Sequence, residues 1–166
     1  MKVSIIGQGY VGLTVGLYAS KEHEIVGYDL NEKLVSDLNS GNSHVEGLDS
    51  NMLKIALKNE KYKATSNPQD IDNSDVVIIA VPTPLDEKRK PDLSFIMKAC
   101  ETISDNLRND ALIINESTSY PGTVRNLIYP SISKKVPFLN HEYSVSPERV
   151  DPGRLDWNQE NTPRLY

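Results

Sequence analysis

The most constraining feature of this sequence is a glycine-rich turn near its N-terminus. Gly7-Gln8-Gly9-Tyr10-Val11-Gly12 has the spacing G-x-G-x-x-G and follows the apolar, β-branched run Val3–Ile6. The next segment, Tyr10–Ser20, is rich in small and apolar residues and is able to form a helix. The glycine pattern alone is a weak signal. Between a strand and a helix, however, it indicates a dinucleotide-binding turn.

Each glycine of this pattern has a physical role. Gly7 permits a tight turn, Gly9 lets a pyrophosphate approach the backbone, and Gly12 lets the helix pack closely on the strand. The N-terminus of the helix adds free N–H groups and a partial positive charge. We therefore expect a diphosphate to bind at this turn.

An acidic residue supports the same interpretation. Asp29 follows the predicted strand Glu24–Tyr28 and lies 22 residues after Gly7. A carboxylate at this place accepts hydrogen bonds from the adenosine ribose and repels a 2′-phosphate, which favours NAD over NADP. Lys33, four residues later, keeps the NADP alternative open. The competing interpretation is a glycine-rich turn with an unrelated surface aspartate.

Apolar runs and helical periodicity alternate along the chain. This order predicts an α/β fold: a Rossmann-like, doubly wound, mostly parallel sheet with helices on both faces. A further helix is expected to begin near Thr123 and to end at Pro130. The other predicted strands are Val76–Val81, Ala111–Ile114 and Glu142–Val145, and the other predicted helices are Asn31–Asn39, Leu53–Leu57 and Phe95–Leu107.

Composition excludes several classes of protein. The 166 residues suit one domain, and their net charge of −5 argues against a nucleic-acid-binding module. No apolar run approaches the length of a membrane-spanning helix, and we expect no secretory signal. The single cysteine, Cys100, permits no internal disulfide, and we expect it to be a core residue in a cytoplasmic protein. The three histidines show no metal-ligand spacing, so we expect no metal site.

Three loops follow predicted strands, and ligands of open α/β sheets bind beyond the carboxyl ends of the strands. The first contains three prolines and offers the hydroxyl of Thr83; the second offers Thr118. In the third, Glu148 is suited to polarise a water or bind a hydroxyl, and Arg149 to bind a phosphate or a sugar hydroxyl. The alternative for all three is ordinary loop, cap or solvated-turn chemistry.

Taken together, these segments resemble the UDP-glucose/GDP-mannose dehydrogenase family. The similarity covers nearly the whole chain, and its later motifs are more specific than the glycine pattern. ESTSYPGT and SPERVDPG look more like the branch that oxidises UDP-N-acetylhexosamines, which implies a UDP-linked N-acetylmannosamine, -glucosamine or -galactosamine for surface-polysaccharide supply. The matching segments are GQGYVGL (7–13), Asp29, GNSHVEGL (41–48), VPTPLDEKRKPDLS (81–94), ESTSYPGT (116–123) and SPERVDPG (146–153).

The resemblance implies a role for each matching residue. The pyrophosphate would be held by the turn, including Gln8, with Tyr10 and Val11 lining it, and the ribose by Asp29. Lys33 is also assigned to the cofactor, although the family's basic residue falls on Leu34 here. The remaining implied roles are Thr83 and Thr118 at the nicotinamide half of NAD, Glu148 in catalysis, and Arg149 and Val150 at the UDP-sugar.

Family members are longer than this chain. They continue into a linking helix with a catalytic Lys and Asn, and into a second domain with a nucleophilic Cys. The resemblance therefore implies an NAD-binding domain over residues 1–150 and a tail over 151–166. Family chemistry oxidises an alcohol through an aldehyde and a Cys thioester to an acid, and reduces two NAD. We therefore expect this chain alone to bind NAD without turnover.

The same resemblance bears on the oligomeric state, and two alternative functions remain open. Full-length family members form homodimers that depend on the linking helix, which leaves this chain free to be a monomer. One alternative function is a stand-alone, non-catalytic Rossmann module that binds NAD or a nucleotide sugar. Another is a different two-domain dehydrogenase, of the hydroxyacid or 6-phosphogluconate type, which the segments VPTP (81–84) and SPERVDPG (146–153) disfavour.

Overall fold

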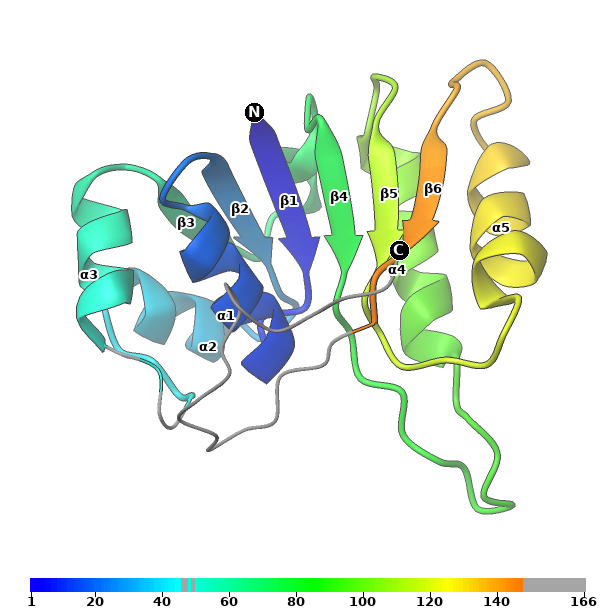
Figure 1. Ribbon diagram of the computed structural model, residues 1–166, viewed down its shortest axis with the longest axis horizontal. Coiled ribbons are helices and arrows are strands. Elements are labelled where there is room, and N and C mark those ends of the chain that lie inside the picture. The colour runs from blue at the N-terminus through cyan, green and yellow to red at the C-terminus, as the bar shows by residue number, and fades with distance from the viewer. Residues whose placement is uncertain (46–47, 49, 148–166) are drawn as a thin grey trace.

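One parallel sheet organises the molecule. The computed structural model describes residues 1–45, 48 and 50–147. The described strands are β1 (Lys2–Ile6), β2 (Glu24–Tyr28), β3 (Tyr62–Thr65), β4 (Val76–Ile79), β5 (Leu112–Asn115) and β6 (Glu142–Val145). Their order is β3-β2-β1-β4-β5-β6, and all neighbours are parallel (Figure 1). This confirms the Rossmann-like fold.

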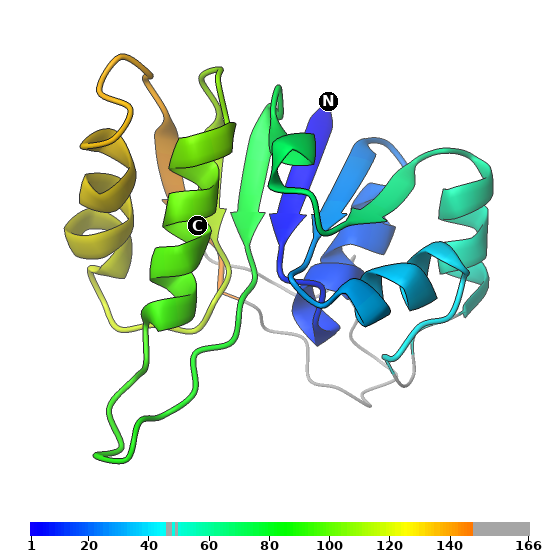
Figure 2. The same ribbon diagram turned by 180° about the vertical axis from the view of Figure 1, so that it is seen from behind.

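Helices cover both faces of this sheet. α1 lies in front of the strands in Figure 1, and α4 and α5 lie behind them, as Figure 2 shows from the other side. The helical segments are α1 (Tyr10–Ala19), α2 (Glu32–Asn39), α3 (Ser50–Lys58), η1 (Pro68–Ile71), α4 (Ser94–Asn106), η2 (Val124–Ile128) and α5 (Tyr129–Ser133). Helices on opposite faces are the mark of a doubly wound sheet.

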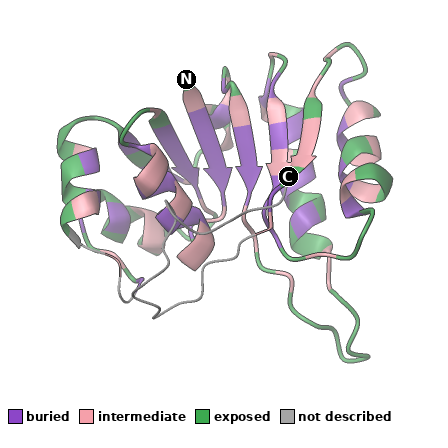
Figure 3. Cartoon of the chain, in the orientation of Figure 1, coloured by how far each residue is buried: buried purple, intermediate pink, exposed green. Residues whose placement is uncertain are grey.

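Alternation along the central strands creates two hydrophobic cores. In β1, Val3 and Ile5 pack in the cluster that includes Leu13 and Leu17 of α1. Ile6 belongs to the other cluster, which includes residues of α4 and α5. Successive side chains of a strand point to opposite faces, so one apolar run supplies both cores. The central strands are accordingly buried along nearly their whole length (Figure 3).

The ends of two predicted elements differ in the structure, and β3 was not among the predicted strands. The predicted strand Val76–Val81 ends at Ile79, because its partner in the neighbouring strand is Ile6, the last residue of β1. Pro130 does not end the helix that begins near Thr123. It lies in the first turn of α5, where a missing N–H costs little. The preceding segment η2 is π-helical, and the Tyr129 N–H bonds to the carbonyl of Val124.

Candidate functional site

The turn between β1 and α1 lies at the carboxyl edge of the sheet, where the strand order reverses. Gly7 has a φ of +94°, and a Cβ there would lie 2.5 Å from the carbonyl oxygen of Ala80, just beyond β4. Its N–H donates to the carbonyl oxygen of Tyr28 at the end of β2, at 2.8 Å. Only glycine combines this backbone angle with this close approach. The turn is thereby fixed to the strands on both sides.

The other two glycines of the turn differ sharply in their surroundings. A Cβ on Gly12, in the first turn of α1, would lie 1.9 Å from the carbonyl oxygen of Gly7. A Cβ on Gly9, the residue that precedes α1, would meet no heavy atom within 4 Å. The first turn of α1 also contains no acidic side chain. Gly9 therefore leaves an electropositive helix N-terminus open to an anion such as a diphosphate.

Asp29 is joined directly to this turn. It follows β2, and one carboxylate oxygen, Oδ2, accepts the backbone N–H of Gln8 at 2.8 Å. The other, Oδ1, accepts the backbone N–H of Asn31 at 2.9 Å. A carboxylate oxygen has lone pairs for more than one donor, so both can also accept from a ribose hydroxyl. The acid and the turn form one unit.

A cavity of about 260 Å³ opens beside Asp29. It lies between the ends of β1, β2 and β4 and the N-terminal half of α4, and its lining is mostly apolar. A mostly apolar cavity with a few polar groups at one end suits a nucleobase and its sugar. Besides Asp29, its lining includes Leu30, Asn31, Val81, Pro82, Phe95 and Thr102.

The remaining predicted cofactor residues lie at different places. Tyr10 and Val11 are half-buried in the first turn of α1, next to the open face of Gly9. Thr83 is half-buried just beyond β4 but lines neither of the cavities described in this section. Lys33 is exposed on α2 and does not line the cavity beside Asp29. The structure thus brings the turn and Asp29 together, while Lys33 remains outside.

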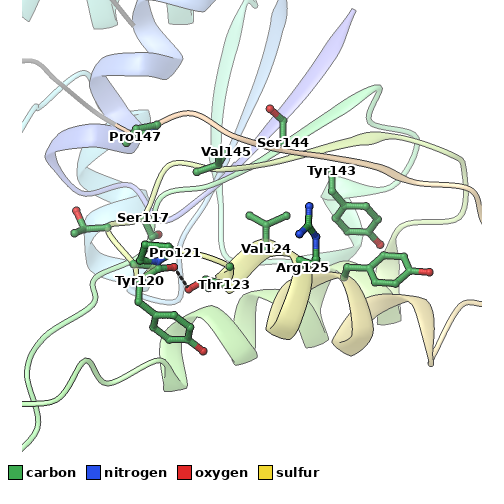
Figure 4. A pocket seen from close by; sticks show the side chains of 14 residues that line it. Ser117, Tyr120, Pro121, Thr123, Val124, Arg125, Tyr143, Ser144, Val145 and Pro147 are labelled. Carbon is green, nitrogen blue, oxygen red and sulfur yellow. Dashed lines mark hydrogen bonds between the residues drawn. The ribbon is translucent and has the colours of Figure 1, made fainter. Parts of the chain in front are cut away.

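A larger cavity of about 760 Å³ lies between β6 and the segment that connects β5 to η2 (Figure 4). Thr118 is exposed there, and the side chain of Arg125 lies between those of Val124 and Tyr143 in the lining of the cavity. The rings of Tyr129 and Tyr143 meet edge to face at 5.3 Å between centroids. This cavity lies at the β6 side of the sheet, away from the cavity beside Asp29.

Ser117 connects the loops that follow β4 and β5. Its Oγ accepts the backbone N–H of Val81 at 2.9 Å and has the carbonyl oxygens of Val81 and Ile79 within donating distance, at 2.9 and 3.3 Å. The side chain is 7% exposed. Sequence reasoning did not single out Ser117, because a serine before a threonine in a loop carries no sign of a bond to another strand.

Cys100 is a core residue, as predicted. It lies on α4 and is 1% exposed, and burial raises the pKa of its thiol to about 12. A thiol held so far from its thiolate form is a poor nucleophile. The predicted residues Glu148, Arg149 and Val150, and the tail 151–166, lie outside the described residues.

Comparison with known proteins identifies the family. The family model described as "UDP-glucose/GDP-mannose dehydrogenase family, NAD binding domain" matches residues 1–165. The chain belongs to this family. It is the NAD-binding domain, which confirms both the predicted resemblance and the predicted cofactor.

Several individual proteins are similar to this NAD-binding domain. It is 35% identical over 154 residues to protein CapL of Staphylococcus aureus, covering 91% of this chain and 35% of that protein. It is 35% identical over 156 residues to a UDP-N-acetyl-D-glucosamine 6-dehydrogenase of Pseudomonas aeruginosa, covering 92% and 36%. The solved UDP-D-ManNAc dehydrogenase of Pyrococcus horikoshii superposes with a TM-score of 0.86 at 34% identity, covering 93% and 38%.

These relatives are much longer than the chain, which spans only a little over a third of their length. Within the described ranges, no helix is both long and apolar enough to cross a membrane. The NAD-binding domain therefore represents one part of the proteins to which it is similar.

Proposed function

We propose that this chain is the NAD-binding part of a UDP-N-acetylhexosamine 6-dehydrogenase. Such an enzyme oxidises the C6 alcohol of the sugar to a carboxylic acid, here for surface-polysaccharide synthesis. Support comes from relatives named for UDP-N-acetyl-D-glucosamine and UDP-N-acetyl-D-mannosamine. The observation that carries the NAD-binding part of this proposal is the 2.8 Å bond between the Gln8 N–H and the Asp29 carboxylate, which joins the expected diphosphate and ribose sites.

The geometry of the turn, of Asp29 and of the cavity beside it supports a site for the diphosphate and the adenosine of NAD. The open face of Gly9 would take the diphosphate, Asp29 the adenosine ribose, and the cavity between Leu30 and Phe95 the adenine. Thr83 and Thr118, beyond β4 and β5, are proposed for the nicotinamide half. Bound NAD supplies the hydride acceptor of the reaction.

The substrate site is a separate part of the proposal. We propose Glu148 for catalysis and Arg149 and Val150 for the UDP-sugar, on the strength of the segment SPERVDPG (146–153). The second oxidation needs a reactive thiolate, which buried Cys100 is unsuited to supply. We therefore propose that this chain alone binds NAD without turnover. From the family resemblance, we also propose that the longer protein is a homodimer. We retain the cytoplasm as its compartment, since the chain has one cysteine and forms no internal disulfide.

Calorimetric titration of the chain tests this proposal. We expect NAD to bind at least about tenfold more tightly than NADP, because the Asp29 carboxylate accepts from a 2′-hydroxyl and repels a 2′-phosphate. Asp29→Asn should weaken NAD about tenfold or more, the usual loss for hydrogen bonds to a charged group. Asp37→Asn, which removes an exposed carboxylate of α2, is the matched control and should leave binding unchanged.

Two results would contradict the proposal. Equal affinity for NAD and NADP would remove the role given to Asp29. Formation of NADH from NAD and a UDP-N-acetylhexosamine by the isolated chain, measured by absorbance, would show that it is catalytically complete.

A further inference from the structure

We infer that Tyr62, on β3, is a positioning residue for the phosphate-binding turn and that it acts through the buried side chain of Gln8. This inference rests on the proposed binding of the NAD diphosphate at the turn. Tyr62 lines neither of the two cavities described above. It lies on a strand two places away from β1 in the sheet.

The Gln8 side chain is fully buried, and each of its polar atoms is bonded. Its amide Nε2 donates to the carbonyl oxygens of Ile5 at 3.0 Å and Gly7 at 3.1 Å. Its Oε1 accepts the hydroxyl of Tyr62 at 2.6 Å. These partners fix the orientation of the amide, because a flipped amide would place its oxygen against two carbonyl oxygens.

The side chain of Tyr62 packs against both β2 and α1. It is 3% exposed, and a Cβ on Gly16 of α1 would lie 3.6 Å from its ring. A Cβ on Gly27 of β2 would lie 2.7 Å from the Tyr62 hydroxyl and 2.4 Å from Gln8 Oε1. Glycine at position 27 therefore makes room for this hydrogen bond. Burial, and secondarily the charge of Asp29, raise the pKa of Tyr62, so its hydroxyl stays protonated and is the donor.

The pair connects to the cofactor site through the backbone. The residue that Tyr62 orients, Gln8, donates its own N–H to Asp29 and bonds the carbonyl of Gly7 with its side chain. Loss of the Tyr62 hydroxyl leaves Gln8 Oε1 buried without a donor, which is costly. Movement of the turn relieves this cost, and such movement displaces the N–H groups that face the diphosphate.

The test is a double-mutant cycle between Tyr62→Phe and Gln8→Met, with NAD, ADP and adenosine as titrated ligands. Tyr62→Phe should weaken NAD and ADP about fivefold to tenfold, the change expected from one hydrogen bond. Adenosine, which lacks the diphosphate, should change less than about twofold. Tyr62→Phe should have no further effect in the Gln8→Met background, because it acts through Gln8.

Ser4→Ala is the control for a purely structural loss. It removes a buried hydroxyl that lies 2.7 Å from Ser74 Oγ, and it should lower thermal stability without changing the affinity for NAD. The inference is overturned if Tyr62→Phe binds NAD as tightly as Ser4→Ala does, if adenosine weakens as much as ADP, or if Tyr62→Phe still weakens binding in the Gln8→Met background. Failure of the unmodified chain to bind NAD would instead overturn the proposed function.

Discussion

Gly12 approaches Gly7 so closely that a Cβ on Gly12 would lie 1.9 Å from the Gly7 carbonyl oxygen. Gly9, which lies between them in the chain, faces open space. The same sequence pattern therefore contains glycines required for packing and a glycine that leaves room for a ligand.

This difference predicts opposite effects of alanine at the two positions. Gly12→Ala should lower the free energy of unfolding by more than about 2 kcal/mol, because the helix must move away from the turn. Gly9→Ala should change it by less than about 0.5 kcal/mol, because its extended backbone suits alanine and its Cβ meets no atom. Gly9→Ala should nevertheless weaken NAD more than about tenfold, since the Cβ enters the diphosphate site. Urea unfolding and calorimetry measure both quantities.

Phe95 is expected to pack on the adenine ring. It lines the cavity beside Asp29 and is 39% exposed, so Phe95→Ala should lower the affinity for adenosine about two- to tenfold, the range expected from loss of an aromatic contact. Met97→Ala is the control, because Met97 is 49% exposed on the same helix and lines neither cavity. Equal effects of the two substitutions would argue against an adenine site here.

Cys100 should resist alkylation in the folded protein. Because burial raises its pKa to about 12, the thiol stays protonated at pH 8, whereas in the unfolded chain its pKa is near the usual value. The rate of reaction with iodoacetamide should therefore follow unfolding and rise with urea. Cys100→Ala should bind NAD as the unmodified chain does. Fast labelling under native conditions would contradict the assigned core position.

Asp70 should make stability depend on pH. Hydrogen bonds from Lys63 at 2.8 Å and Thr65 at 2.6 Å lower the pKa of the Asp70 carboxyl. A lowered folded-state pKa gives stability that is present above the unfolded-state pKa and is lost as the pH falls through the lowered value. Asp70→Asn should therefore cost about 1 kcal/mol at pH 7 and progressively less between about pH 5 and pH 2.

The control for this pH effect is Asp105→Asn. Asp105 pairs with Lys135 at 3.2 Å, but both side chains are largely exposed. Such surface pairs contribute little, so its cost in urea unfolding should stay below about 0.5 kcal/mol at every pH. A cost for Asp70→Asn that does not change with pH would contradict the assignment.

The sequence was sufficient to predict the parallel sheet, because its central strands are unbroken apolar runs. It did not reveal β3, whose four residues include Lys63 and contribute only Tyr62 and Ala64 to the hydrophobic core. An edge strand covered on one face lacks the continuous apolar run of a central strand. The prediction that Pro130 ends a helix was wrong for a different reason. A proline stops a helix only where its missing N–H is needed for a hydrogen bond.

The candidate site was predictable only where a motif is local. The turn and Asp29 belong to one strand–helix–strand unit, so their spacing is visible in the chain. Phe95 reaches the same cavity from α4, and Tyr62 reaches Gln8 from β3. Such contacts depend on how distant segments pack, and nothing in the residues around Phe95 or Tyr62 marks them in advance.

Ser117 has a mechanical consequence. Because one buried hydroxyl bonds to the backbone just beyond β4 from its place beyond β5, the bases of the two loops cannot separate without breaking that bond. A displacement of either loop base is therefore expected to move the other, so the strand ends beneath the proposed NAD site should shift together rather than independently.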